Sequence, residues 1–445
     1  MSMTREDLQV AVEDGSIDTV VAAFTDMQGR LIGKRVTGRF FMEKVIEEWH
    51  ACDYLLACDM DMEPVPGFEA ASWARGYGDF AIRPDLSTLM RTPWLPGTAV
   101  VLGDVVDHDG RDLPHSPRAV LKRQIARVEE HGLHANMASE LEFYVFDDSF
   151  AEARDKRYHE LATTGWYIED YHVLQSTKIE PLLRTIRNQM EAAGIPVEFS
   201  KGEWGPGQHE LNLTYADALT MADRHVVYKN GVKEIACLQG KAVTFMPKWR
   251  ADLAGNSCHV HCSLVDGEGR AVFEGEGETF RRFLAGMLAV GRDTTFFLAP
   301  SINAYKRFQA ASFAPTNMVW SRDNRTSGFR VLGHGPATRI ECRVPGGDAN
   351  PYLAFAALLA AGLHGVENAL DLEPAFEGDA YGSKDIPTLP TSLHEAVGLL
   401  DASAPLRAAM GDTVIDHYVH AGRWEQRTFD QAVTDWELMR YFERS

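Results

Sequence analysis

Four segments of this 445-residue chain carry side chains that could bind metal ions or anions. The segments and their charged or imidazole residues are SELEFYVFD (Glu140, Glu142), KGEWGPGQHEL (Glu203, Glu210), NSCHVHCSL (His259, His261) and TRIECRVP (Arg339, Glu341, Arg343). Residues two apart on a β-strand share a face, so three of these segments place polar groups on one side and apolar groups on the other. Such a polar face is too costly to bury dry and needs solvent, a metal or a polyanion. We therefore expect these strands to line a common cleft.

Each motif taken alone also has a simpler interpretation. A Glu-x-Glu or His-x-His strand is often a solvated surface, Arg-x-Glu-x-Arg can be an ion-pair ladder, and Gly-Pro-Gly can be only a turn. The CHVHC sequence suggests zinc, but on a strand Cys258 and Cys262 face away from His259 and His261. Four such ligands cannot converge on one ion, so zinc is disfavoured. The ordered set of motifs is more specific than any single member.

Composition excludes several classes of function. The formal net charge of −20 disfavours nucleic-acid binding, although a local basic pocket could still hold a small anion. The six cysteines form no CxxC pair, which indicates free thiols in a reducing compartment. The start of the chain does not resemble a signal peptide, and the most apolar stretch, Tyr352 to Leu363, is too short to span a membrane. We expect a cytoplasmic protein in which this stretch is a buried core helix.

The residues before about position 112 are predicted to form a small, strand-rich domain. Thr19–Thr25 and Leu31–Thr37 flank a turn at Gly29 and are typical of a hairpin. Further strands are predicted at residues 54–59, 80–83 and 99–106. His108–Pro117 is rich in turn formers, so we place the domain boundary there and predict domains at 1–112 and 113–445.

The second part alternates helices and strands. A helix is predicted from Pro117, with Ser116 as N-cap, to His131 before Gly132. Another helix is predicted over residues 179–193 and ends at Gly194. Short strands are predicted between and after these helices, at residues 139–146, 210–214 and 257–265.

The blocks SELEFYVFD, GEWGPGQHE, GNSCHVHCSL, NAYKRF, DNRTSGFR and RIECRVPGGDANPYLAFAALLAAG, in this order, resemble the glutamine synthetase type I family from about Asp18 onward. The resemblance implies an α+β fold, with an N-terminal β-grasp domain followed by a glutamine-synthetase-type α/β catalytic domain. It also implies a dodecamer of two stacked hexameric rings with active sites between neighbours. The expected reaction uses ATP to convert the γ-carboxylate of L-glutamate to γ-glutamyl phosphate, which an amine then attacks.

The resemblance also assigns roles to individual residues. One metal ion would be held by Glu142, Glu203 and Glu210, and a second by Glu140, His259 and Glu341. Glutamate would be bound by Gly255, Arg307, Arg325 and Arg343, and ATP by His261, Ser263, Arg325, Arg330 and Arg339. Arg325 and Glu341 would act directly in catalysis. A ligand set made mostly of carboxylates suits Mg²⁺ or Mn²⁺.

Two departures from the family pattern fall on the ammonium site. In the flap segment KRFQAASFAP, Phe313 stands where ammonia-using members have a glutamate, and phenylalanine cannot transfer a proton. The family's N-terminal Asp-Gly-Ser-Ser block is replaced by WHACDYLLACDMDMEP. Together with FTDMQGRLIGKR and TDWELMRYFERS, these departures resemble the glutamate–amine ligase branch, whose acceptors include ethanolamine, polyamines, methylamine and isopropylamine. Ethanolamine is favoured, with Phe313 as an acceptor-site residue.

Other interpretations stay open at this point. Phe313 could reflect neutral drift in an ordinary ammonia-using glutamine synthetase, or the chain could be a catalytically inactive structural or regulatory relative. Ala254 stands where members commonly have an asparagine near the glutamate amino group, so the glutamate pocket could differ. The family's adenylylation segment is also absent, so the resemblance gives no ground for assuming that Tyr381 is modified.

Overall fold

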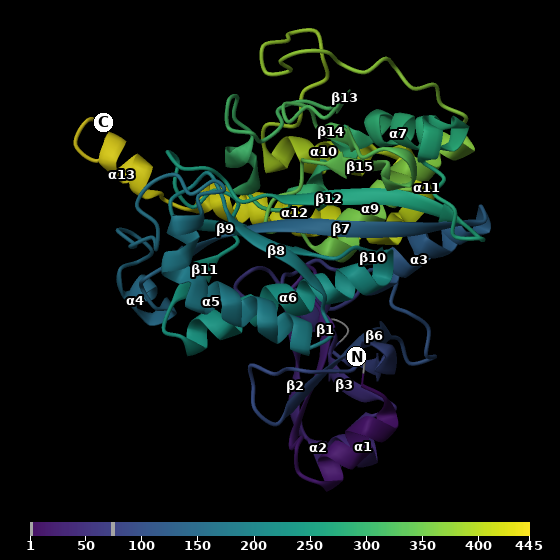
Figure 1. Ribbon diagram of the computed structural model, residues 1–445, viewed down its shortest axis with the longest axis vertical. Helices are drawn as coiled ribbons and strands as arrows, with labels where there is room; N and C mark the ends of the chain where they lie inside the picture. The colour runs from purple at the N-terminus through teal and green to yellow at the C-terminus, as the bar shows by residue number, and fades with distance from the viewer. Residues whose placement is uncertain (1–2, 73–75) are drawn as a thin grey trace.

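The computed structural model describes residues 3–72 and 76–445. Its N-terminal part is a six-stranded mixed sheet of order β2-β1-β6-β4-β3, with β5 paired to β6. The elements are α1 (Arg5–Glu13), β1 (Thr19–Thr25), β2 (Leu31–Thr37), α2 (Gly38–Phe40), β3 (Trp49–Cys52), β4 (Asp79–Pro84), β5 (Met90–Arg91) and β6 (Thr98–Val106). This unit lies at the bottom of Figure 1 and is the expected β-grasp domain.

The predicted hairpin is confirmed, with β1 and β2 antiparallel from Thr19↔Thr37 to Thr25↔Leu31. The strand predicted at residues 54–59 is wrong, because the chain forms the 3₁₀-helix η2 (Asp53–Leu56) there. Leu56, Ala57 and Cys58 are all buried, and a tight turn buries consecutive side chains whereas a strand would alternate them. The helix α1 was not predicted.

The second part is built on a nine-stranded sheet of order β13-β14-β15-β12-β7-β9-β8, with β10 and β11 also paired to β7. Its strands are β7 (Leu133–Phe146), β8 (Val197–Gly202), β9 (Gln208–Leu213), β10 (Ala216–Asp217), β11 (Ala242–Thr244), β12 (Cys258–Asp266), β13 (Trp320–Arg322), β14 (Phe329–Leu332) and β15 (Arg339–Cys342). The boundary proposed at 112/113 falls between β6 and the first helix of this part.

Helices pack with this sheet around one large core, except the C-terminal helix, which buries no residue and projects from the body in Figure 1. They are α3 (Pro117–Glu130), α4 (Phe150–Asp155), α5 (Val173–Ala192), α6 (Ala218–Leu238), α7 (Glu278–Ala289), α8 (Gly291–Leu298), α9 (Pro351–Glu367), α10 (Leu393–Ala402), α11 (Ala404–Met410), α12 (Asp412–Gln431) and α13 (Asp435–Tyr441). Helices α3 and α6 pack on β7, α5 packs on β8, and α9 packs on α3, α6 and α7 (Figure 1).

The predicted core helix is confirmed, because every residue from Tyr352 to Leu363 is buried within α9. Across the described ranges, no helix is both long and apolar enough to cross a membrane. The first predicted helix is also confirmed as α3. The second predicted helix is found as α5, but it begins at Val173 and not at 179. Its start was missed because Val173 and Leu174 are exposed and do not belong to the buried apolar face of the helix.

Candidate active site

Strand pairing brings the polar residues of five distant segments onto one face of the nine-stranded sheet. The directly paired positions across the sheet are Glu210–Glu142, Glu140–His259, His261–Glu341 and Glu341–Arg330. The intervening residues Leu141, Val260 and Ile340 are buried in the core, which confirms the predicted alternation. Cys258 and Cys262 are likewise buried away from the histidines. Residues from β7, β9, β12, β14 and β15 therefore meet in one place.

The first acidic cluster consists of Glu142, Glu203 and Glu210, whose carboxylate oxygens lie within 4.8 Å of one another. Burial and the neighbouring Glu203 charge raise the pKa of Glu142, and the same causes raise the pKa of Glu210 well above its ordinary value. The Ser257 N–H donates to Glu142 Oε2 at 2.8 Å. Lys201 forms an ion pair with Glu203. The cluster thus holds more negative charge than the lysine can balance.

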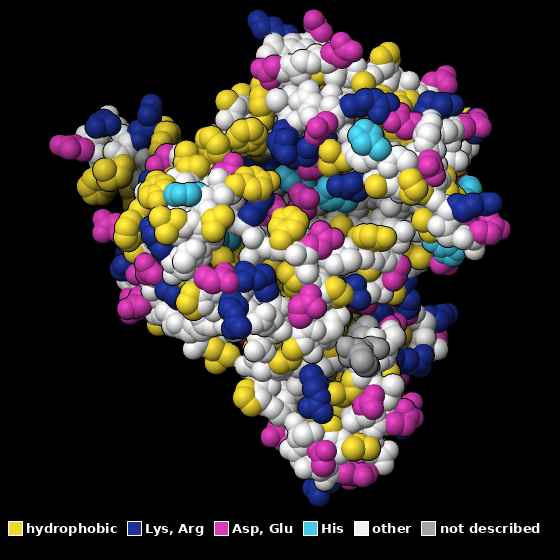
Figure 2. Space-filling view, viewed as in Figure 1, with side chains coloured by type: hydrophobic (Ala, Val, Ile, Leu, Met, Phe, Trp, Pro, Cys, Tyr) yellow, Lys and Arg dark blue, Asp and Glu magenta, His cyan; other side chains and the backbone are white. Residues whose placement is uncertain are grey.

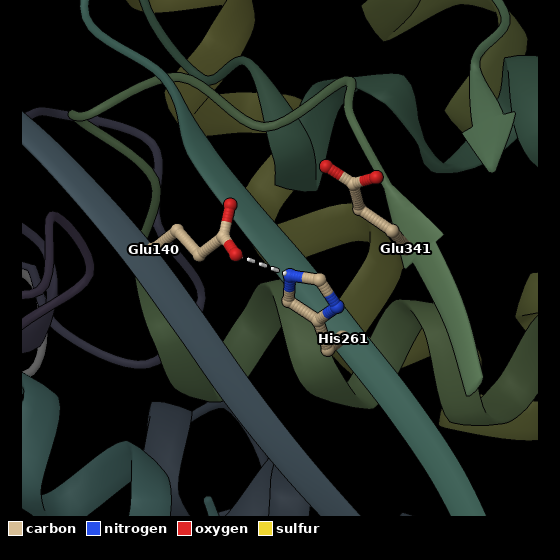
Figure 3. Close-up of side chains that lie close together, drawn as sticks. All are labelled: Glu140, His261 and Glu341. Atoms are coloured by element: carbon tan, nitrogen blue, oxygen red, sulfur yellow. Dashed lines mark ion pairs between the residues drawn. The ribbon is translucent and has the colours of Figure 1, made fainter. Parts of the chain in front are cut away.

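The second cluster brings Glu140, His261 and Glu341 within 4.8 Å of one another. Figure 3 shows Glu140 and His261 reaching toward each other, with Glu341 facing the same space. His261 Nε2 lies 2.9 Å from Glu140 Oε1. His259 is also close, with Nδ1 at 3.3 Å from Glu140 and 3.5 Å from Glu341. Both histidines, and not only the predicted His259, therefore face these carboxylates.

Glu341 is held ionised between cations. It is 1% exposed, and burial raises its pKa. The opposing effect of His259 and Arg343 is larger, so the pKa of Glu341 lies below its ordinary value. Arg343 Nη1 donates to Glu341 Oε1 at 2.7 Å, and Arg330 Nη1 donates to Oε2 at 3.1 Å. A fixed carboxylate of this kind is suited to binding a cation without first losing a proton.

The two clusters fit a pair of divalent metal ions. Carboxylate oxygens with one or two imidazoles form a donor set that Mg²⁺ and Mn²⁺ accept. Three buried or half-buried carboxylates within 4.8 Å repel one another strongly unless a cation or a proton lies among them. Burial and this repulsion together raise the pKa values of Glu142 and Glu210.

The arginines predicted to bind glutamate lie beside the first cluster. Arg307 is buried and donates to the backbone carbonyls of Arg343 and Pro345 at 3.3 and 3.0 Å. Within the described residues, the buried Nε groups of Arg307 and Arg343 have no hydrogen-bond partner. Gly255 packs directly on this arginine, because a Cβ there would lie 2.6 Å from Arg307 Cγ. The backbone at Gly255 thus packs against the alkyl stem of the arginine that is predicted to hold the substrate.

The predicted nucleotide residues are divided between two adjoining cavities. One cavity, of about 600 Å³, is lined by Glu140, His261, Ser263 and Arg339 among others. The other, of about 500 Å³, is lined by Glu140, Arg325, Arg330 and the acidic clusters among others. Because Glu140 lines both cavities, molecules bound in the two would meet at the second cluster. Figure 2 shows acidic, basic and histidine side chains gathered in a hollow of the surface on this face.

Phe313 lies at the mouth of the 500 Å³ cavity. Its side chain is 49% exposed, and its carbonyl oxygen accepts a hydrogen bond from Arg343 Nη2 at 3.1 Å. The neighbouring Ala314 carbonyl accepts a hydrogen bond from the Tyr381 hydroxyl at 2.9 Å. The Ala254 carbonyl accepts one from Tyr144 at 2.8 Å, so this residue joins the cleft through its backbone.

Several cleft residues were not predicted from the sequence. Lys201 and Trp204 flank Glu203, and Gln208 donates to Glu142 Oε2 at 3.2 Å and to the Gly255 carbonyl at 3.0 Å. Lys201 and Gln208 each lie two residues from an acidic residue of the first cluster, so strand alternation could have identified both. Trp204 lies in a turn and left no such signal.

Comparisons with known proteins agree with this geometry. The family model for the glutamine synthetase catalytic domain matches residues 114–441. The chain is 51% identical to the gamma-glutamylethanolamide synthetase GlnA4 of Streptomyces coelicolor, over 99% of this chain and 96% of that protein. It is 37% identical to the glutamate–isopropylamine ligase of a Pseudomonas species, over 97% of this chain and 96% of that protein.

Two solved structures are similar to this chain over nearly its whole length. A GmaS–ADP complex covers 100% of both chains with a TM-score of 0.86 and 28% identity. GmaS without ligand covers 98% of this chain and 99% of its own, with a TM-score of 0.85 and 29% identity. The chain therefore belongs to the glutamine synthetase family, in its glutamate–amine ligase branch, and is an ATP-dependent carbon–nitrogen ligase.

Proposed function

We propose that this enzyme joins an organic amine to the γ-carboxylate of L-glutamate through γ-glutamyl phosphate, with ethanolamine as the favoured amine. In the first step, a γ-carboxylate oxygen attacks the terminal phosphorus of ATP and ADP leaves. In the second step, the amine nitrogen attacks the acyl carbon, the carbon–oxygen bond to phosphate breaks, and the nitrogen loses a proton. Phosphorylation is needed because a free carboxylate has no adequate leaving group.

Two divalent metal ions, Mg²⁺ or Mn²⁺, would neutralise the phosphate charges and align the reacting groups. Glu142, Glu203 and Glu210 would hold one ion. Glu140, His259 and Glu341 would hold the other, with His261 facing the same carboxylates from the nucleotide cavity. The distances within the first cluster support its three ligands. In the second cluster, His261 lies within 4.8 Å of Glu140 and Glu341, and His259 lies 3.3 and 3.5 Å from them, so either imidazole is placed to complete the set.

The arginines would divide the remaining work. Arg307 and Arg343 would orient the glutamate carboxylates, with Gly255 closing the pocket wall. Arg325 and Arg330 would stabilise charge on the transferring phosphoryl group. On the other side of the second cluster, Ser263 and Arg339 would contact the nucleotide, which their place in the 600 Å³ cavity supports.

The acceptor assignment depends mainly on Phe313. An aromatic ring at the cavity mouth offers packing surface to the carbon arm of an organic amine but no charge to ammonium. The names of two relatives, a gamma-glutamylethanolamide synthetase and a glutamate–isopropylamine ligase, support an organic acceptor. The higher identity to the first supports ethanolamine.

The test is phosphate release with glutamate, ATP and Mg²⁺, measured against ammonia, ethanolamine, isopropylamine, methylamine and a polyamine. We expect ethanolamine to give the highest kcat/KM. Ammonia use equal to or above that of every organic amine would instead support an ordinary glutamine synthetase. A chain that fails to bind nucleotide with either metal would be an inactive relative.

A replacement at the acceptor site sharpens this test. Phe313→Glu restores a carboxylate at the flap, so ammonia use should rise relative to ethanolamine. Phe313→Leu is the matched control, since it keeps an apolar side chain and should leave ammonia use low. If Phe313→Glu leaves the ratio of ammonia use to ethanolamine use unchanged, the role given to Phe313 is contradicted.

We further propose a dodecamer of two hexameric rings and a cytoplasmic setting, which family membership supports. Light scattering of the purified chain tests the assembly.

A further inference from the structure

An aromatic pair stands between the first acidic cluster and the glutamate arginines. The rings of Trp204 and Phe313 lie 5.6 Å apart at 61°, in an edge-to-face arrangement. Trp204 directly follows Glu203, and the Phe313 carbonyl is bound by Arg343 at 3.1 Å. The pair is therefore attached at one end to the predicted metal site and at the other to the predicted glutamate site. Under the proposed function, the acceptor amine would approach the γ-carboxylate between these two sites.

The aromatic pair is only half-covered and locally strained. Trp204 is 47% exposed and Phe313 is 49% exposed, so both rings present apolar surface to the cavity that they line. Phe313 has a φ of +59°, a left-handed conformation that is costly for a bulky residue. Strain of this kind persists where the surrounding structure holds it, and it is concentrated at functional sites. The Arg343 hydrogen bond to its carbonyl is one such restraint.

The charges beside the aromatic pair favour an uncharged arm. Lys201 forms an ion pair with Glu203 and lies 3.8 Å from Asp170, and its ammonium group is 4.6 Å from the centre of the Tyr171 ring. Among the described residues that line this cavity, every other carboxylate belongs to one of the two predicted metal clusters. Within this chain, a second ammonium group on the acceptor would therefore meet only carboxylates that already face Lys201 or are predicted to hold metal, and it would be repelled by Lys201 and by the bound metal ions.

We infer that the acceptor is a primary monoamine whose short alkyl or hydroxyalkyl arm packs on Trp204 and Phe313, and that Lys201 excludes diamines and polyamines. This inference rests on the proposed function and extends it from ethanolamine to short primary monoamines as a class. It assigns Trp204 and Lys201 as residues that determine acceptor specificity.

The experiment uses three amines of matched length, n-butylamine, 3-aminopropanol and 1,3-diaminopropane, with ammonia as the reference. The intact enzyme should use both neutral-arm amines with a kcat/KM at least about tenfold above that of the diamine. Trp204→Ala should lower kcat/KM for the neutral-arm amines about three- to tenfold relative to ammonia, because an aromatic contact is lost. Lys201→Met should raise use of the diamine relative to n-butylamine.

Two further variants keep the test interpretable. Trp204→Phe retains a ring and should keep most of the preference over ammonia, which separates ring packing from damage to the neighbouring Glu203. Trp166→Ala removes a tryptophan that is 76% exposed and does not line the cavity, so the ratios should not change. Thermal stabilisation by Mg²⁺ in each variant reports whether the first acidic cluster is intact.

The outcomes separate the two levels of the proposal. If the intact enzyme uses no organic amine better than ammonia, the proposed function fails and the inference fails with it. If organic amines are good substrates but the kcat/KM for 1,3-diaminopropane equals that for n-butylamine, only the inference is overturned. The same holds if Trp204→Ala leaves every ratio to ammonia unchanged while Mg²⁺ still stabilises the variant.

Discussion

Replacing Glu210 by glutamine should change stability in opposite directions with and without metal. Glu142, Glu203 and Glu210 lie within 4.8 Å of one another. At that separation and an effective dielectric constant near 20, each pair of like charges repels by about 3 kcal/mol. Glutamine has nearly the same shape but no charge, so Glu210→Gln removes two of these repulsions. The metal-free fold should therefore become more stable.

The net gain is smaller than the full repulsion. Burial and the charge of Glu203 raise the pKa of Glu210 well above its ordinary value, which reduces the charge repulsion that the substitution can remove. Lys201 also lies beside Glu203 and offsets part of the rest. We expect a net gain of about 1–2 kcal/mol, which corresponds to a rise of about 1–2 °C in Tm for a chain of this size.

The assay is thermal unfolding with and without saturating Mg²⁺ or Mn²⁺. Metal should raise the Tm of the unmodified chain. Glu210→Gln should have a higher Tm without metal, a much smaller rise in Tm when metal is added, and a metal affinity at least about tenfold weaker. Glu130→Gln on the exposed end of α3 is the matched control and should change neither value. A variant that is less stable without metal yet gains as much from it would refute the reasoning that these three carboxylates share one cation.

Three further predictions test other parts of the site and core. Glu341→Gln should lower phosphate release at least about a hundredfold, because Glu341 is a predicted metal ligand between two arginines; a near-normal rate would remove it from the site. Gly255→Ala should raise the KM for glutamate about tenfold or more and leave the KM for ATP unchanged, since its Cβ would lie 2.6 Å from Arg307 Cγ; equal effects on both substrates would contradict this. Burial lowers the pKa of His115 to about 4. Below pH 6.5 the unfolded chain therefore binds more protons than the folded chain, and the free energy of unfolding decreases as the pH is lowered. Denaturant unfolding should show the chain losing about 2 kcal/mol more than His115→Gln between pH 7 and pH 5, and parallel loss would show that His115 does not contribute.

Strand alternation identified much of the candidate site from sequence. Leu141, Val260 and Ile340 point into the core as expected, so their polar neighbours face the cleft. The same reasoning failed at Tyr54–Asp59, where consecutive buried residues form a turn rather than a strand. Apolar character alone cannot separate these two outcomes over so short a segment.

Other features needed contacts between distant segments. The sequence places His259 and His261 on the same face, but only the pairing of β12 with β7 and β15 brings both to the acidic cluster. The aromatic pair of Trp204 and Phe313 joins two loops whose approach no local pattern predicts.

The sequence by itself determined which side of each strand is polar, the order of the motifs, and through them the family and its chemistry. Only the tertiary structure decided that His261 joins the second cluster, where Lys201 places its charge, and which rings line the cavity. The physical reason is that the face a side chain takes on a strand depends on local geometry, with a period of two residues. Its partners across the sheet depend on strand register, which is set by how distant apolar faces pack together.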